Sequence, residues 1–267
     1  MTVLASTAQA PGEIRALSEK TGDAQKEGLT VGRVLLTPAV IVIALVGLYL
    51  WVQHRGLDSV ETRVLNSTNL TQATFRHLLL VGVSTLLVIS LAIPLGVLLT
   101  RRSAARLRPA VTGIAVIGQS LPSFGLVVVF VLVFGIDIKF VILALTVAAF
   151  LPVLTNTIEG LEGISPELRE SASGIGMNGW QVLTRVELPL AVPVILAGLR
   201  TSLVWNVGTA AVAALAGAGG LGGVIVAGLI QYRDIITFVG AALTAILALL
   251  LDYLAKVAQH LITPRGL

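Results

Sequence analysis

A glycine-rich segment in the last quarter of the chain has the spacing of a nucleotide-binding loop. Residues 217–222 read Gly-Ala-Gly-Gly-Leu-Gly and match the pattern G-x-G-x-x-G. That pattern binds a dinucleotide only where it follows a strand and opens a helix within a βαβ unit. Here both flanks are apolar and resemble membrane spans, which argues against a nucleotide site. Two interpretations remain: a flexible bend near the outer end of a transport pathway, or close helix packing through small residues. The candidate residues are Gly217, Gly219, Gly220 and Gly222.

Side chains for other common chemistries are missing or scattered. The sequence has no cysteine, and its three histidines lie far apart in loops or at the ends of apolar stretches, so we expect no metal site. None of the four lysines lies in a G-x-x-x-x-G-K-[ST] phosphate-binding loop, and no Ser/His/Asp grouping is present. We therefore expect a chain that is not an enzyme and binds no cofactor. Its energy should come from a partner or from an ion gradient.

Polar residues within otherwise apolar stretches are candidates for a transport pathway. Arg200 lies roughly 16 Å along a helix that begins near Pro189, a depth at which an unpaired charge costs at least a few kcal/mol. It is either a pathway or gating residue, or a structural residue that pairs with Asp252 or extends to the cytoplasmic surface. Gln119, Pro122 and Asn206 are further pathway candidates. For the two amides, hydrogen bonding between helices is the alternative.

The elements that must hold these residues are membrane spans. The chain has 267 residues, of which 55% are hydrophobic and 12% are charged, and its mean hydropathy is +0.94. In soluble domains about a quarter of the residues are charged, so this composition predicts an all-α integral membrane protein. The net charge of +4 does not indicate nucleic-acid binding, because the basic residues sit in short loops beside apolar stretches.

Six membrane-spanning helices are predicted, at residues 34–52, 78–100, 110–134, 140–157, 190–215 and 235–255. The third should be kinked or broken near Pro122, and residues 53–76 should form a polar loop. With the N-terminus in the cytoplasm, the inner loops carry twelve Lys and Arg and the outer loops carry five. This difference predicts an N-in/C-in topology. We expect a flexible cytoplasmic tail at residues 1–33 and a short cytoplasmic tail at residues 259–267.

The longest polar interval between apolar spans lies at residues 159–189 and contains five of the fourteen acidic residues. Ser165 and Pro166 are typical of a helix start, and Gly174 and Gly176 of its end. Asn178, with Gln181 three residues later, predicts a capping box for a second helix. Pro189 should stop that helix or bend it into the next span. We expect two short helices joined by a glycine turn on the cytoplasmic membrane surface.

This interval resembles the EAA motif of ABC importer permeases. The motif has E-A-A, three residues, G, nine residues, I, one residue and L-P; Ser171 here replaces the second residue and Val186 the isoleucine. In that family the motif forms a coupling helix that docks into a groove of a separate ATPase subunit. The resemblance implies an ATPase-coupling role for six residues: Glu170, Ser171, Ala172, Gly176, Glu187 and Pro189. Glu170, Ala172 and Gly176 would lie at the ATPase contact.

Further segments resemble the permeases of importers for glycine betaine, carnitine, choline or proline. These segments are Gln119–Ser123, Leu151–Asn156, Glu187–Ala191, Gly198–Thr201 and Ala214–Gly222. The resemblance implies a type I ABC importer (MetI-like) permease fold, with a permease core at 74–258 and a cytoplasmic coupling helix at 159–189. Residues 34–73 would add an extra first span and an external loop.

The resemblance also implies partners and a mechanism. The partners are two cytoplasmic ABC ATPase subunits that bind ATP-Mg, a second permease subunit of the same or a homologous sequence, and an external substrate-binding protein, all at the cell membrane of a prokaryote. Transport would proceed by alternating access. A permease for sulfonates or methionine is an alternative within the class, and a secondary transporter driven by an ion gradient is an alternative outside it.

Overall fold

The computed structural model describes residues 31–263, and these residues form helices and no strands. The chain divides into two compact units, residues 1–40 and 41–267. The first described helix, α2 (Val31–Gln53), begins in the first unit and continues into the second. Residues 31–33, predicted to lie in a tail, are therefore helical, and the rest of that predicted tail lies outside the described residues.

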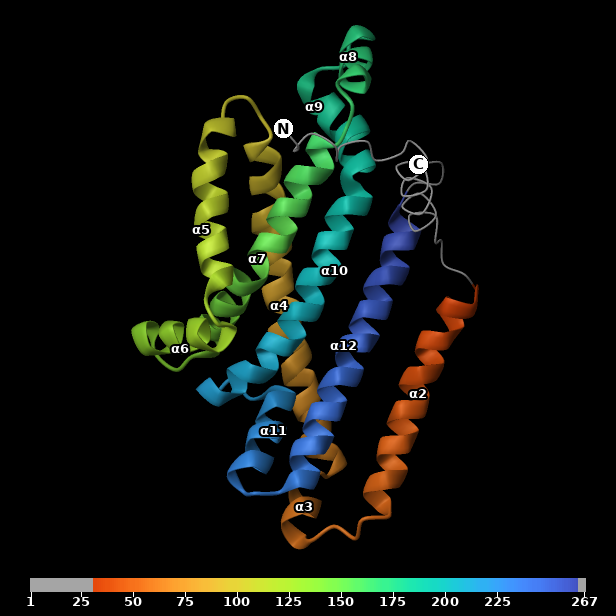
Figure 1. The fold of residues 1–267 in the computed structure, drawn as a ribbon, viewed down its shortest axis with the longest axis vertical. Coiled ribbons are helices and arrows are strands. Elements are labelled where there is room, and N and C mark those ends of the chain that lie inside the picture. Colours follow the sequence, from red (N-terminus) through yellow and green to blue (C-terminus); the bar gives the residue numbers. More distant parts are fainter. Residues whose placement is uncertain (1–30, 264–267) are drawn as a thin grey trace, which may run out of the picture. The chain divides into compact units, whose positions relative to one another are not determined.

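Four long helices form the centre of the second unit. They are α4 (Ser67–Leu99), α7 (Ile138–Glu162), α10 (Leu188–Ala213) and α12 (Asp234–Ile262). Figure 1 shows them side by side, with α7 and α10 in the middle of the bundle. Among the described residues, five helices are long and apolar enough to cross a membrane, or six if a bent pair counts as one span. Helix α12 continues to Ile262, so residues 259–262 of the predicted tail are helical.

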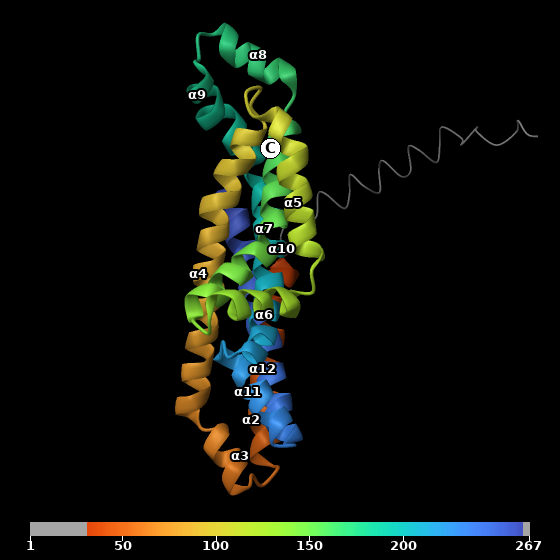
Figure 2. The ribbon, with the colours of Figure 1, turned by 90° about the vertical axis from the view of Figure 1, so that its left-hand side faces the viewer.

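The bent pair occupies the place of the predicted third span. Helix α5 (Arg108–Ser120) and helix α6 (Ser123–Phe134) meet at an angle of 98°. Leu121 is extended there, as a residue before proline tends to be, and Pro122 cannot donate the hydrogen bond that would continue α5. The predicted break near Pro122 is therefore confirmed. Figures 1 and 2 show that α6 runs across the long helices and not along them.

The glycine-rich segment contains both a bend and a close contact. Gly217, Gly219 and Gly220 have φ angles of +87°, +75° and +69°, which residues with a side chain rarely adopt. They turn the chain from α10 into the short apolar helix α11 (Gly220–Ile230). Gly222 lies in a tight contact, because a Cβ there would be 2.1 Å from the carbonyl oxygen of Ala211. The two structural interpretations of this segment thus apply to different glycines.

The interval predicted as a polar loop at residues 53–76 is largely helical. It contains α3 (Ser59–Val64) and the first turns of α4. Asp58 accepts from the backbone N–H groups of Val60 and Glu61, and the Glu61 side chain accepts from the Asp58 N–H in return. This capping box stabilises a helix too short and polar for hydrophobic periodicity to reveal. Asp58 also pairs with Arg233 at 2.6 Å, which joins this region to the start of α12.

Helices α7 and α10 approach each other through small residues. A Cβ at Gly198 of α10 would lie 2.5 Å from Asn156 Cβ and 2.7 Å from the carbonyl oxygen of Pro152, both on α7. Gly160 of α7 makes a similar close approach to Ala191 and Val194 of α10. Within a membrane, apolar area alone does not drive helices together, so such close backbone contacts matter for packing.

We expect Gly198→Ala to destabilise the protein, because its Cβ would meet backbone that cannot move without separating α7 from α10. Overpacking of this kind costs about 1–3 kcal/mol. Thermal unfolding in detergent, followed by tryptophan fluorescence, should show a lower Tm. Gly82→Ala in α4 is the matched control, since nothing lies within 4 Å of its Cβ position. Equal Tm values for the two variants would contradict the packing argument.

Candidate functional site

Two short helices lie between α7 and α10 and extend beyond the end of the bundle (Figures 1 and 2). These are α8 (Pro166–Gly174) and α9 (Gly179–Val182), and a π-helical turn, η2 (Leu183–Glu187), connects α9 to α10. The helix does not stop at Pro189. In the π turn, Leu188 N–H bonds to the carbonyl of Leu183, five residues back, which lets the helix pass through a proline near its start.

The ends of α8 and α9 agree with the sequence-based prediction, with one exception. Asn178 and Gln181 form the predicted reciprocal capping box, with both hydrogen bonds at 2.9 Å. Gly176 has a φ of +89°, as the predicted glycine turn requires. Ser165 precedes α8 but makes no side-chain cap to its backbone. The pKa of the Glu167 carboxyl is lowered, chiefly because the carboxylate accepts a hydrogen bond from its own backbone N–H. The Ser165 hydroxyl, which donates to the same carboxylate, lowers it further.

The outer surface of this α8–α9 hairpin combines acidic and apolar side chains. Glu170, Ser171 and Gly176 are exposed there, whereas Ala172 is only 6% exposed and packs within the chain. Three large apolar side chains are also exposed on the hairpin: Leu168 at 49%, Ile175 at 77% and Trp180 at 71%. Such residues outside the apolar spans indicate a surface that another protein covers.

An ion cluster around one buried carboxylate joins the hairpin to the spans. Glu187 is 3% exposed, and its carboxylate lies 2.5 Å from an Arg101 guanidinium nitrogen and 2.9 Å from Arg169 Nε. Arg101 follows α4, Arg169 lies in α8, and Glu187 lies in the turn that leads into α10. Arg169 also donates to the carbonyl of Leu161 on α7. The Glu187 carboxylate therefore links α8 to the ends of α4 and α10, and Arg169 adds a separate link from α8 to the end of α7.

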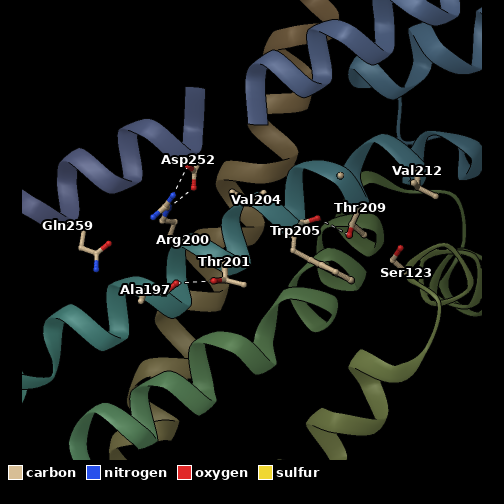
Figure 3. A pocket seen from close by; sticks show the side chains of 11 residues that line it. Ser123, Ala197, Arg200, Thr201, Val204, Trp205, Thr209, Val212, Asp252 and Gln259 are labelled. Atoms are coloured by element: carbon tan, nitrogen blue, oxygen red, sulfur yellow. Dashed lines mark hydrogen bonds and ion pairs between the residues drawn. The ribbon is translucent and has the colours of Figure 1, made fainter. Parts of the chain in front are cut away.

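A groove runs along α10 on the side that faces α12 and α6, and its lining is mostly apolar apart from a few polar side chains (Figure 3). Its volume is about 880 Å³. Most of its lining comes from α10, and Ser123, Asp252 and Gln259 complete it from α6 and α12. Figure 3 shows Arg200 pointing toward Asp252 of α12, and Trp205 on the opposite side of α10.

Arg200 and Asp252 form an ion pair within this groove. Arg200 Nε donates to Asp252 Oδ1, and a terminal guanidinium nitrogen donates to Oδ2 at 2.7 Å. The two side chains keep 35% and 29% of their surface exposed. The pair with Asp252, one of the sequence-based alternatives for Arg200, is therefore present. Its exposure shows that it forms part of the groove wall.

The other predicted pathway residues do not join this groove. Asn206 is fully buried and donates to Ser84 of α4 at 2.7 Å, which is the interhelical bond offered as its alternative. Gln119 and Pro122 lie at the bend between α5 and α6. Gly217, Gly219, Gly220 and Gly222 lie toward the other end of the bundle from the α8–α9 hairpin. A pathway role for these residues stays a prediction.

Sequence reasoning missed the partners of Glu187 and the exposed apolar side chains of the hairpin. Arg101 and Arg169 belong to the basic residues of the predicted inner loops, and nothing in their local sequence shows that they share one carboxylate. Ile175 and Trp180 gave a signal that could have been used, because both lie beside glycines in or next to the predicted turn between the two short helices, where a large apolar side chain is readily exposed.

Comparison with known proteins gives consistent matches. The model of the family "Binding-protein-dependent transport system inner membrane component" matches residues 92–265. The glycine betaine/carnitine/choline transport system permease protein OpuCB of Bacillus subtilis is 40% identical over 76% of this chain and 92% of its own length. The osmoprotectant import permease protein OsmW of Salmonella typhimurium is 36% identical over 79% of this chain and 100% of its own length.

Solved structures agree on the fold. An inward-facing structure of the MetNI methionine ABC transporter has a chain with a TM-score of 0.67 and 26% identity, covering 78% of this chain and 100% of that one. A chain of the bacterial alginate ABC transporter has a TM-score of 0.62 at 21% identity, over 87% of this chain and 95% of that one. The predicted MetI-like permease fold and the resemblance to osmoprotectant permeases are confirmed. The relatives are named as transport permeases, in agreement with the prediction that the chain is not an enzyme.

We expect Glu187→Gln to loosen the α8–α9 hairpin, because it leaves two neighbouring guanidinium groups without their shared carboxylate. Loss of these bonds should cost about 1–3 kcal/mol. Hydrogen exchange across residues 166–187 should accelerate. Arg169→Gln should have a smaller effect in the Glu187→Gln background than in the wild type, because the two residues are coupled.

Glu162→Gln is the control for these Glu187 and Arg169 variants. It removes a carboxylate that pairs with Arg108 on an exposed surface, where an ion pair contributes about 0–1 kcal/mol. The same exchange rates in Glu187→Gln and Glu162→Gln would show that the Glu187 cluster does not hold the hairpin.

Proposed function

The chain belongs to the binding-protein-dependent transport system inner membrane components, and on this premise we propose that it is the transmembrane permease subunit of an ATP-driven osmoprotectant importer. Its substrates would be quaternary amines such as glycine betaine, carnitine or choline, or proline. The observation that carries the proposal is the α8–α9 hairpin, which presents the EAA-type motif beyond the bundle end and is anchored by Glu187.

The hairpin is proposed to lie in the cytoplasm, against an ATPase subunit that binds ATP-Mg. Charge supports this orientation: Arg101, Arg102 and Arg106 lie between α4 and α5, and Arg108 begins α5, at the bundle end that carries the hairpin. The last turn of α12 lies at the same end (Figure 1). This arrangement supports a cytoplasmic C-terminus and, with the excess of inner basic residues, the N-in/C-in topology.

Coupling would follow from the Glu187 cluster. When the ATPase subunits close on ATP, a force on the hairpin acts on Arg169 in α8. Glu187 and Arg101 then pass this force to α10 and α4. Because Arg169 also bonds to Leu161 of α7, three spans would move with the hairpin and open the pathway alternately outward and inward.

A second permease subunit, identical or homologous, is proposed to cover the α10 groove. Charged residues inside membranes face other protein or water, because contact with lipid tails is costly. The Arg200–Asp252 pair is partly exposed at the middle of α10, about 18 Å from its start. A facing copy would enclose the groove and provide the wall that a single chain lacks.

The substrate class comes from the relatives. The permeases OpuCB and OsmW, whose names refer to glycine betaine, carnitine, choline or osmoprotectants, are 40% and 36% identical to this chain. The methionine transporter chain is 26% identical to it. This difference favours osmoprotectants over methionine. A separate external binding protein is proposed to select the substrate, and the whole assembly would reside in the inner membrane of a prokaryote.

We expect the purified chain to retain co-expressed ABC ATPase subunits, and to lose them in Glu170→Lys, which reverses a charge on the exposed hairpin. Trp180→Ala should weaken the association by about tenfold or more, as loss of a buried interface tryptophan does. Co-purification and ATP-driven uptake of glycine betaine by proteoliposomes measure both steps.

Tyr232→Ala is the matched control, because Tyr232 is 93% exposed at the opposite end of the bundle. It should leave ATPase retention unchanged. Uptake that follows a proton or sodium gradient, with no ATPase retained by the wild type, would replace this function by secondary transport.

A further inference from the structure

The ion pair in the α10 groove has unused binding capacity. Arg200 has five N–H donors, and within residues 31–263 its bonds to Asp252 use two of them. Both side chains remain about a third exposed to the groove. Two small side chains that line the groove, Ala197 one turn earlier in α10 and Thr201 next to Arg200, leave space beside the guanidinium (Figure 3).

We propose that Arg200 and Asp252 together form a binding subsite for a zwitterionic solute inside the permease. The solute carboxylate would accept hydrogen bonds from the free N–H groups of Arg200, and its ammonium group would lie beside the Asp252 carboxylate. This inference deepens the proposed function and rests on it. It assigns part of the substrate selection to this chain, in addition to that of a binding protein.

Charge balance supports a zwitterion over a simple cation or anion. The Arg200–Asp252 pair has no net charge, and neither does a zwitterion, so the complex places no net charge within the membrane. In the complex, the charges alternate in sign, and each gains a second neighbour of opposite sign. A cation such as choline would contact Asp252 alone and would lie closer to Arg200 than a positive charge favours.

The groove suits a passing solute. Its volume of about 880 Å³ is much larger than a molecule the size of glycine betaine needs, and it is open to one side. A binding site along a transport pathway has to be weak enough for release. An ion pair that keeps its internal bonds while a solute binds meets that condition, because the solute gains only the additional contacts.

The test measures binding to the permease–ATPase complex without its binding protein, by equilibrium dialysis with radiolabelled glycine betaine and, separately, choline. The wild type should bind glycine betaine more tightly than choline. Arg200→Gln should weaken glycine betaine binding about tenfold or more, because it removes a charge-assisted contact. Choline binding should be unchanged or tighter, because Asp252 is released from its partner.

Two further variants separate binding from folding. The double variant Arg200→Gln/Asp252→Asn keeps a neutral polar pair, so it should remain folded and retain its ATPase subunits even where the single variants do not, yet bind glycine betaine no better than Arg200→Gln. Arg108→Gln is the control, because it disrupts an exposed ion pair outside the groove. It should bind both solutes as the wild type does.

Equal glycine betaine affinity in the wild type and the double variant would overturn the subsite, as would no binding to the wild type. ATP-driven uptake separates this result from failure of the proposed function. If the wild-type complex imports glycine betaine but its binding does not depend on Arg200, the proposed function stands and the subsite is overturned. Binding that depends on Arg200 without ATP-driven uptake supports the subsite and contradicts the importer.

Discussion

Polar groups inside a membrane must find partners in protein or water, and this constraint organises the structure. Asn206 in α10 donates to Ser84 in α4, and Ser202 in the same helix donates to the carbonyl of Ala149 in α7. These bonds join α10 to α4 and α7 at depths where lipid offers no alternative. Arg200 follows the same rule through Asp252, but its pair stays partly exposed. The buried hydrogen bonds of α10 are therefore structural contacts, whereas its partly exposed ion pair lines the groove.

Small residues set the distances at which these bonds form. Gly198 allows α10 to approach Pro152 and Asn156 of α7, and Gly160 provides the reciprocal contact. At the other end of the bundle, positive φ angles at Gly217, Gly219 and Gly220 turn the chain so that α11 packs against α4 and α12. Gly222 then fits against the carbonyl of Ala211. The glycine pattern that resembled a nucleotide loop therefore serves chain reversal and close packing.

The sequence predicted the spans and the hairpin because their signals are local. Apolar runs, the Leu121-Pro122 break and the Asn178–Gln181 capping box each depend on a few adjacent residues. The α3 helix and the start of α4 were missed because caps, not periodicity, stabilise them. The Glu187 cluster was missed for another reason: Arg101 is 86 residues from its carboxylate partner, and no local pattern connects them. Pairing of Arg200 with Asp252 could be proposed because few charges lie within the spans, which leaves few possible partners.

Helix α10 connects the two sites of this chain. Glu187 lies immediately before its first residue, and Arg200 lies about 18 Å further along it. Asp252 belongs to α12, which has no residue in the Glu187 cluster. A force on the α8–α9 hairpin would therefore move Arg200 with α10, while Asp252 moves only as far as α12 follows. Because the attraction energy between two charges is inversely proportional to their separation, such a shift would weaken the ion pair and expose its charges to a solute. One rigid helix would then relate ATPase closure to the state of the groove, without a further moving part.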